Sequence, residues 1–147
     1  MMTTADTHSR LHPVVGTVLL LAAAALVAVA LNATIAWVGV TLGAPAGYGP
    51  LSLPAQALFT VIGVAVGWIG WRLVTTRARH PRRVLRLLVP VVTALTLIPD
   101  LLLLAAPVIP GTNLAAVVSL MCMHLIVVTC AVPAYILATR LQPTPTP

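Results

Sequence analysis

The chain has 147 residues, of which 60% are hydrophobic and only 7% are charged. A soluble domain carries about 25% charged residues, so this composition excludes a protein that covers its surface with polar side chains. The formal net charge of +6 could attract nucleic acid, but the arginines gather at the ends of apolar runs, where such residues set membrane orientation. We therefore predict a protein whose main partner is the lipid bilayer and which binds no nucleic acid.

Four apolar segments follow one another along the chain, each longer than the roughly 20 residues that cross a bilayer as a helix. They cover residues 13–42, 51–74, 84–106 and 113–139. Strands are excluded, because alternation is absent and an open sheet leaves unpaired backbone groups in lipid. Short connections favour antiparallel neighbours. The predicted fold is all-α, an antiparallel bundle of four transmembrane helices, with a cytoplasmic N-terminal tail at 1–12 and a disordered cytoplasmic tail at 140–147.

The arginines predict the orientation of this bundle, because Lys and Arg concentrate in cytoplasmic loops. Six of them surround the second connection: Arg72, Arg77, Arg79, Arg82, Arg83 and Arg86. Arg10 and Arg140 flank the two termini, whereas the first and third connections contain neither Lys nor Arg. We predict a multi-pass protein of the plasma membrane with both termini and the middle loop in the cytoplasm.

Each segment carries small or polar residues on one helical face. Lipid gives no hydrophobic drive for helices to associate, so close packing of small residues and interhelical hydrogen bonds must supply it. In the second segment this face holds Gly63, Gly67 and Gly70, which we expect to pack against another helix. In the first segment it holds Ala25, Ala28, Asn32, Ala36, Gly39 and Gly43. The abundance of Ala and Gly leaves chance as the alternative explanation.

Asp100 is one of only two acidic side chains and lies inside the third apolar segment. A carboxylate at that depth costs about 2.5–3.5 kcal/mol on insertion scales, so it needs a partner or a role. Thr96 shares a helical face with Asp100. Counting inward from the predicted outer surface places Asn32, Gln56 and Thr60 in the same half of the membrane. These residues form a predicted polar cluster.

His124, in the fourth segment, is the remaining member of this cluster. It lies about 7–8 Å deeper than Asp100, at 1.5 Å per residue along each helix. Helix tilt or a break at Pro99 would allow direct contact, and a bridging water is the alternative. Met121 and Cys122 precede His124, but no second histidine lies in any span. We predict no metal and no cofactor.

Three functions remain open from these residues. The first is a non-enzymatic membrane protein in which Asp100 and His124 bind a small lipophilic or cationic ligand or a proton. The second is a structural subunit, of a homo-oligomer or a membrane complex, in which the same cluster only locks the helices. The third is an intramembrane enzyme acting on a lipid-like substrate, although the chain offers no nucleophile–base constellation and no phosphate-binding loop.

Two short motifs carry a resemblance to a known group of proteins. Ile98, Pro99 and Asp100 lie in the third segment, and Met123, His124 and Leu125 lie in the fourth. The chain as a whole is rich in Ala, Val and Arg and contains no Lys. Together with the basic middle loop, this pattern resembles an uncharacterised family of small four-span membrane proteins of high-GC Gram-positive bacteria. The resemblance covers about residues 14–139 and implies an integral membrane protein without naming a substrate.

Overall fold

The computed structural model describes residues 5–142, and the side chains of residues 13–142. The described chain is all-helical and contains no strand. Its elements are α1 (Ala5–Thr41), the short 3-10 helix η1 (Gly49–Leu51), α2 (Leu53–Arg77), α3 (Pro81–Ala105) and α4 (Leu114–Leu141). The predicted fold class is therefore confirmed.

The helices extend beyond several of the predicted apolar segments, because the backbone stays helical through polar residues that flank an apolar run. α2 follows Ser52 with a proline in its first turn and continues to Arg77. α3 begins at Pro81, a position that suits proline because its missing N–H would have no helical acceptor. α1 begins at Ala5, so it includes residues 5–12 of the predicted N-terminal tail. Of the predicted C-terminal tail, residues 143–147 lie outside the described residues.

All four helices are long and apolar enough to cross a membrane. The large apolar side chains they expose are those that lipid would contact, for example Leu26 on α1, Phe59 on α2, Leu87 on α3 and Leu125 on α4. A bundle of this kind exposes apolar surface because its solvent is hydrocarbon. These helices indicate a multi-pass membrane protein.

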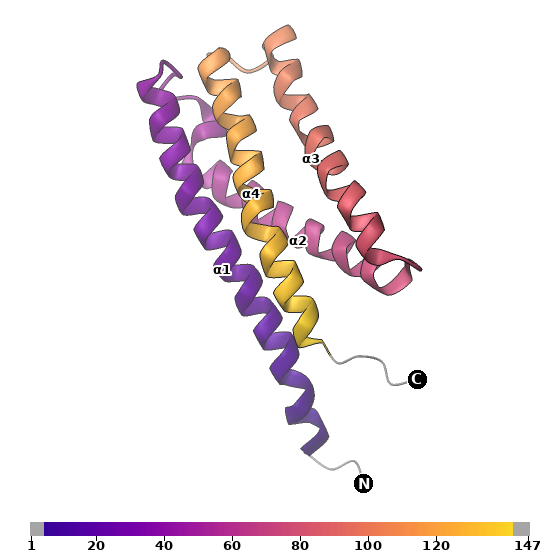
Figure 1. The fold of residues 1–147 in the computed structure, drawn as a ribbon. Helices are drawn as coiled ribbons and strands as arrows, with labels where there is room; N and C mark the ends of the chain where they lie inside the picture. Colours follow the sequence, from indigo (N-terminus) through magenta and orange to yellow (C-terminus); the bar gives the residue numbers. More distant parts are fainter. Residues whose placement is uncertain (1–4, 143–147) are drawn as a thin grey trace.

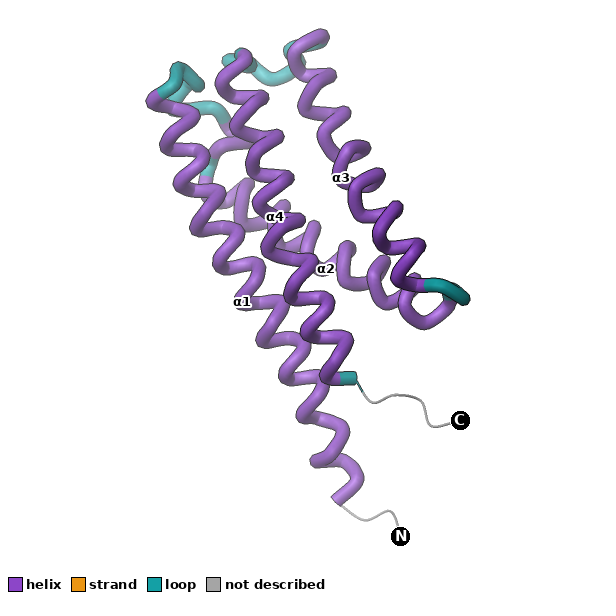
Figure 2. Tube along the Cα trace, viewed as in Figure 1, coloured by secondary structure: helices purple, strands orange, loops and turns teal. Residues whose placement is uncertain are grey.

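The four helices are not packed equally. α4 occupies the centre and contacts each of the other three. α1 runs beside it along most of its length, and α2 crosses both obliquely (Figure 1). α3 stands apart from α1, and within the described chain its one buried residue is Asp100. The connections are short and lie at the two ends of the bundle (Figure 2).

The contact between α1 and α4 is built from small side chains. On α1 the buried positions include Ala25, Ala28, Ala36 and Gly39, which recur at the three- and four-residue spacing of one helical face. On α4 the buried positions facing the interior are mainly alanines, together with Val117, Ser119, Met123 and Tyr135. Small side chains let two backbones approach closely, which is the main source of helix association in lipid.

Candidate functional site

Asp100 and His124 meet directly across the contact between α3 and α4. Oδ2 of Asp100 lies 3.0 Å from Nδ1 of His124. The Asp100 side chain is 8% exposed, whereas that of His124 is 40% exposed. The fold therefore brings these two residues together without the bridging water that the depth comparison left open.

The imidazole has a second oxygen beside the same nitrogen. Nδ1 of His124 also lies 2.9 Å from the carbonyl oxygen of Leu120, one turn earlier in α4. Both neighbours of Nδ1 are acceptors, so this nitrogen carries the hydrogen. One N–H cannot point straight at both oxygens, and Oδ2 of Asp100 receives no hydrogen bond of good geometry from any described residue. The carboxylate is thus close to an imidazole but incompletely satisfied.

The helices fix this pair from two sides. Asp100 lies in the last two turns of α3, directly after Pro99, and α3 continues through this proline without interruption. His124 lies near the middle of α4, which, like α2, contacts each of the other helices. The carboxylate is consequently held against the central helix by a helix that buries little else.

A second polar contact joins α1 to α2 and does not include Asp100. Asn32 donates from Nδ2 to the hydroxyl of Thr60 at 3.2 Å, and both residues are buried. Gln56 is also buried and donates to the carbonyl oxygen of Leu51. No hydrogen bond connects these residues to Asp100 or His124 within the described part of the chain, so the predicted single cluster is resolved into two polar sites.

Both amides of this second site keep one oxygen without a partner. Oδ1 of Asn32 and Oε1 of Gln56 are buried and accept no hydrogen bond from the described residues. An unpaired polar atom away from water costs roughly 1–3 kcal/mol. In each side chain, therefore, the amide nitrogen donates a hydrogen bond, while the amide oxygen has no donor among the described residues of the bundle.

Thr96 differs from the expectation for it. Its side chain is exposed, and its hydroxyl donates to the carbonyl oxygen of Thr93 at 2.8 Å within the same helix. The helical spacing that aligned Thr96 with Asp100 spans four residues, and the buried part of α3 is too narrow to include both. Thr96 accordingly stays outside the Asp100 site.

The three glycines of α2 also have different surroundings. A side chain at Gly67 would overlap the hydroxyl of Tyr135, so this position requires glycine. A Cβ added at Gly63 would lie 3.9 Å from the Val127 side chain, which is an ordinary van der Waals contact. Gly70 has no atom of another helix within 4 Å of that point and is exposed. Close packing on this face is thus concentrated at Gly67.

Tyr135 shows what helical periodicity does not reveal. Its hydroxyl donates to the carbonyl oxygen of Val64 at 2.7 Å, which ties α4 to α2. Its ring lies 5.7 Å from those of both Trp68 and Trp71. The acceptors used by Tyr135, His124 and Gln56 are all backbone carbonyls, and a backbone carbonyl leaves no signature in residue type.

The six arginines of the middle connection are distributed over the last turns of α2, the loop and the first turns of α3. Arg72 lies over the ring of Trp68 at 5.7 Å from its centroid. Arg77 is exposed in the last turn of α2. The other four, Arg79, Arg82, Arg83 and Arg86, line one hollow.

Comparison with known proteins identifies the family. The model of a family of unknown function, DUF6069, matches residues 9–141. The chain belongs to the DUF6069 family. No curated protein and no solved structure matches it. The family has no assigned function, so the chemistry has to be argued from the residues.

Proposed function

We propose that this DUF6069 protein is a non-enzymatic membrane protein whose Asp100–His124 pair binds and releases a proton inside the membrane. The observation that carries this proposal is the 3.0 Å approach of Nδ1 of His124 to a buried carboxylate oxygen that lacks a well-formed hydrogen bond. A carboxylate at membrane depth is costly while it is charged and unsatisfied. Binding a proton removes that cost.

A proton fits this site better than a larger ligand does. The imidazole of His124 already lies at hydrogen-bond distance from Oδ2, so a larger ligand would have to displace it. A proton can reside on the Asp100 carboxyl group, on the oxygen that does not face the N–H of His124. The partial exposure of His124 gives the pair a side from which a proton can arrive.

Infrared spectroscopy tests this proposal directly. The chain has two acidic side chains, Asp6 and Asp100, so its carboxyl bands are few. In proteoliposomes titrated with acid, we expect a protonated-carboxyl band that Asp100→Asn removes and Asp6→Asn leaves in place. His124→Gln should shift the midpoint of that band, because it removes the neighbouring imidazole. A band unaffected by Asp100→Asn, or a midpoint unaffected by His124→Gln, would rule the proposal out.

The second candidate is a structural role for the same pair, and one observation favours it. Asp100 is the one buried residue of α3, so its contact with His124 can serve as the attachment of that helix. Thermal unfolding of Asp100→Asn in detergent separates the two roles. A proton-binding site predicts that stability holds or rises in this variant, whereas a purely structural lock predicts that it collapses.

The proposal includes an orientation in the plasma membrane, with both termini and the connection between α2 and α3 in the cytoplasm. The support is the concentration of Arg72, Arg77 and the four loop arginines at one end of the bundle, since Lys and Arg favour the cytoplasmic side. A single cysteine introduced at Ala78, in a background without Cys122 and Cys130, reports this orientation. Labelling of that cysteine by an impermeant reagent added outside intact cells would contradict it.

A further inference from the structure

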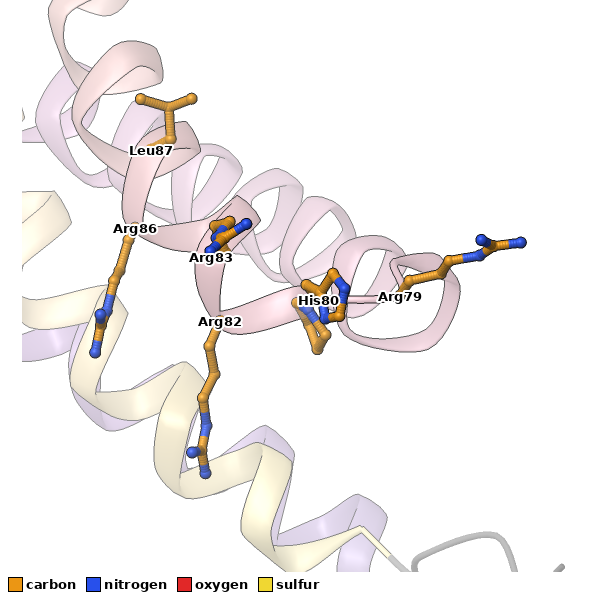
Figure 3. A pocket seen from close by; sticks show the side chains of 7 residues that line it. Arg79, His80, Arg82, Arg83, Arg86 and Leu87 are labelled. Carbon is orange, nitrogen blue, oxygen red and sulfur yellow. The ribbon is translucent and has the colours of Figure 1, made fainter.

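A hollow of about 720 Å³ lies where α2 turns into α3, well away from the Asp100–His124 pair. Its lining is dominated by four guanidinium groups, with one imidazole and two apolar side chains beside them (Figure 3): Arg79, Arg82, Arg83, Arg86, His80, Pro81 and Leu87. Arg82 and Arg86 extend in the same direction in this view, whereas Arg79 points away to the side. The hollow is thus strongly cationic and open.

Local structure explains why these cations line the same hollow. α2 ends in the extended residue Ala78, and α3 starts at Pro81 after His80. The short connection places Arg79 beside the first turn of α3. Arg82 and Arg86 are four residues apart, which puts them on one face of that helix.

The start of α3 adds positive potential to the hollow. A helix carries a partial positive charge at its N-terminus because its first N–H groups lack helical acceptors. His80 makes no side-chain capping bond, and the first turn of α3 contains no acidic residue. The potential of the helix end and the charges of the arginines therefore add without local compensation.

The chain does not supply enough negative charge to balance this hollow. It contains eight Arg and two acidic side chains. Asp100 is committed to His124, and at 1.5 Å per residue it lies about 21 Å along α3 from Arg86. Among the described residues, the contact between Asp100 and His124 is the one close approach of an acidic to a basic side chain. The counter-charge for the hollow has to come from outside the chain.

The position of the hollow selects the source of that counter-charge. It lies at the ends of two helices that are both long and apolar enough to span the membrane, at the level where phospholipid headgroups are found. Beyond Leu87, the exposed Leu88 and Val91 continue an apolar surface along α3. We propose that this hollow binds the phosphate headgroup of an anionic phospholipid, whose acyl chain lies along α3.

The chemistry of arginine suits this ligand. A guanidinium group pairs with two phosphate oxygens at once, which a lysine ammonium cannot do. Basic groups beside a membrane helix are a known means of attracting anionic lipid. Here, the hollow would add a defined position for one headgroup to the general attraction of a basic surface.

Native mass spectrometry of the full chain in detergent, with added phosphatidylglycerol or phosphatidylcholine, tests the proposal. The decisive variant is R82Q/R86Q. Its matched control is R77Q/R140Q, which removes the same charge from exposed arginines at the same end of the bundle but outside the hollow. We expect the first pair to weaken phosphatidylglycerol binding by about 100-fold, since each direct hydrogen bond from a guanidinium group to the phosphate contributes a factor of about ten.

The control pair should retain binding within about threefold of the unaltered chain, and circular dichroism should show all variants helical. R82K/R86K keeps the charge and loses the two-oxygen pairing, so it should bind with intermediate affinity. Equal losses in both glutamine pairs would overturn the proposal in favour of a diffuse basic surface. The proposal would also be overturned if the unaltered chain bound phosphatidylcholine as tightly as phosphatidylglycerol. Displacement of bound phosphatidylglycerol by inorganic phosphate at a similar concentration would overturn it as well.

Discussion

The contact between α1 and α4 and the contact between α3 and α4 hold helices together in opposite ways. The first buries a long face of Ala and Gly on α1 against alanines, Ser119 and Met123 on α4. The second buries one residue of α3, Asp100, against His124. Small side chains distribute the attraction over many turns, whereas the polar pair concentrates it at one point.

This difference shows how a membrane protein can combine a rigid part with an adjustable one. Packing of small residues does not change with pH or with a ligand, because no titratable group takes part in it. Under the proposed function, an attachment made by one carboxylate and one imidazole would change when a proton binds. The titratable pair lies on the helix with the least other burial.

The largest expected effect comes from disturbing the α1–α4 contact. In Gly39→Val, the new Cβ would overlap the Ser119 hydroxyl and would lie 3.1 Å from the Cβ of Ser119. We expect this overpacking to lower the free energy of unfolding by about 3 kcal/mol, near the upper end for such changes. Reversible unfolding in mixed detergent measures this value.

Gly70→Val is the matched control for that variant, because nothing of another helix lies within 4 Å of the added Cβ. Its effect should stay within about 0.5 kcal/mol, as for surface substitutions in general. Equal losses in the two variants would show that glycine matters for the helices themselves and not for the contact between α1 and α4.

The second effect concerns the attachment of α3. Asp100→Leu removes the polar contact with His124, which is worth about 1 kcal/mol for an interhelical pair in a membrane. Hydrogen exchange of α3 should then accelerate roughly fivefold, while α1 and α4 keep their rates. Mass spectrometry of the protein in nanodiscs measures each helix separately. Faster exchange throughout the bundle would show that the two contacts are not independent.

The smallest effect concerns the hydrogen bond that joins α4 to α2. Tyr135→Phe removes the bond of 2.7 Å to the Val64 carbonyl, and we expect a loss of about 0.6 kcal/mol, the average for such bonds in a membrane. Thr34→Val is its control, because the Thr34 hydroxyl bonds only to Ala30 in its own helix. Both variants are measured by unfolding in mixed detergent, and a loss at Thr34 as large as that at Tyr135 would argue against an interhelical contribution.

Much of the candidate site was predictable from residue type and spacing. An acidic residue within an apolar segment singled out Asp100, and relative depth linked it to His124. The grouping of Asn32 and Gln56 with Asp100 was less accurate, because depth compares positions along the membrane normal and contains no information about which helices are neighbours. Asn32 meets Thr60 on α2, while Asp100 meets α4.

The sequence by itself determined four apolar helices, their antiparallel order and the small-residue face of α1, because hydrophobic length and a period of 3.6 residues are local properties. Tertiary structure decided that α4 lies at the centre, that α3 stands apart and that Gly67, not Gly70, faces Tyr135. It also decided that one N–H of His124 lies between Asp100 and the Leu120 carbonyl. These features depend on how each helix is rotated against its neighbours. The backbone carbonyls that accept the hydrogen bonds are the same in every residue, so residue type does not reveal them.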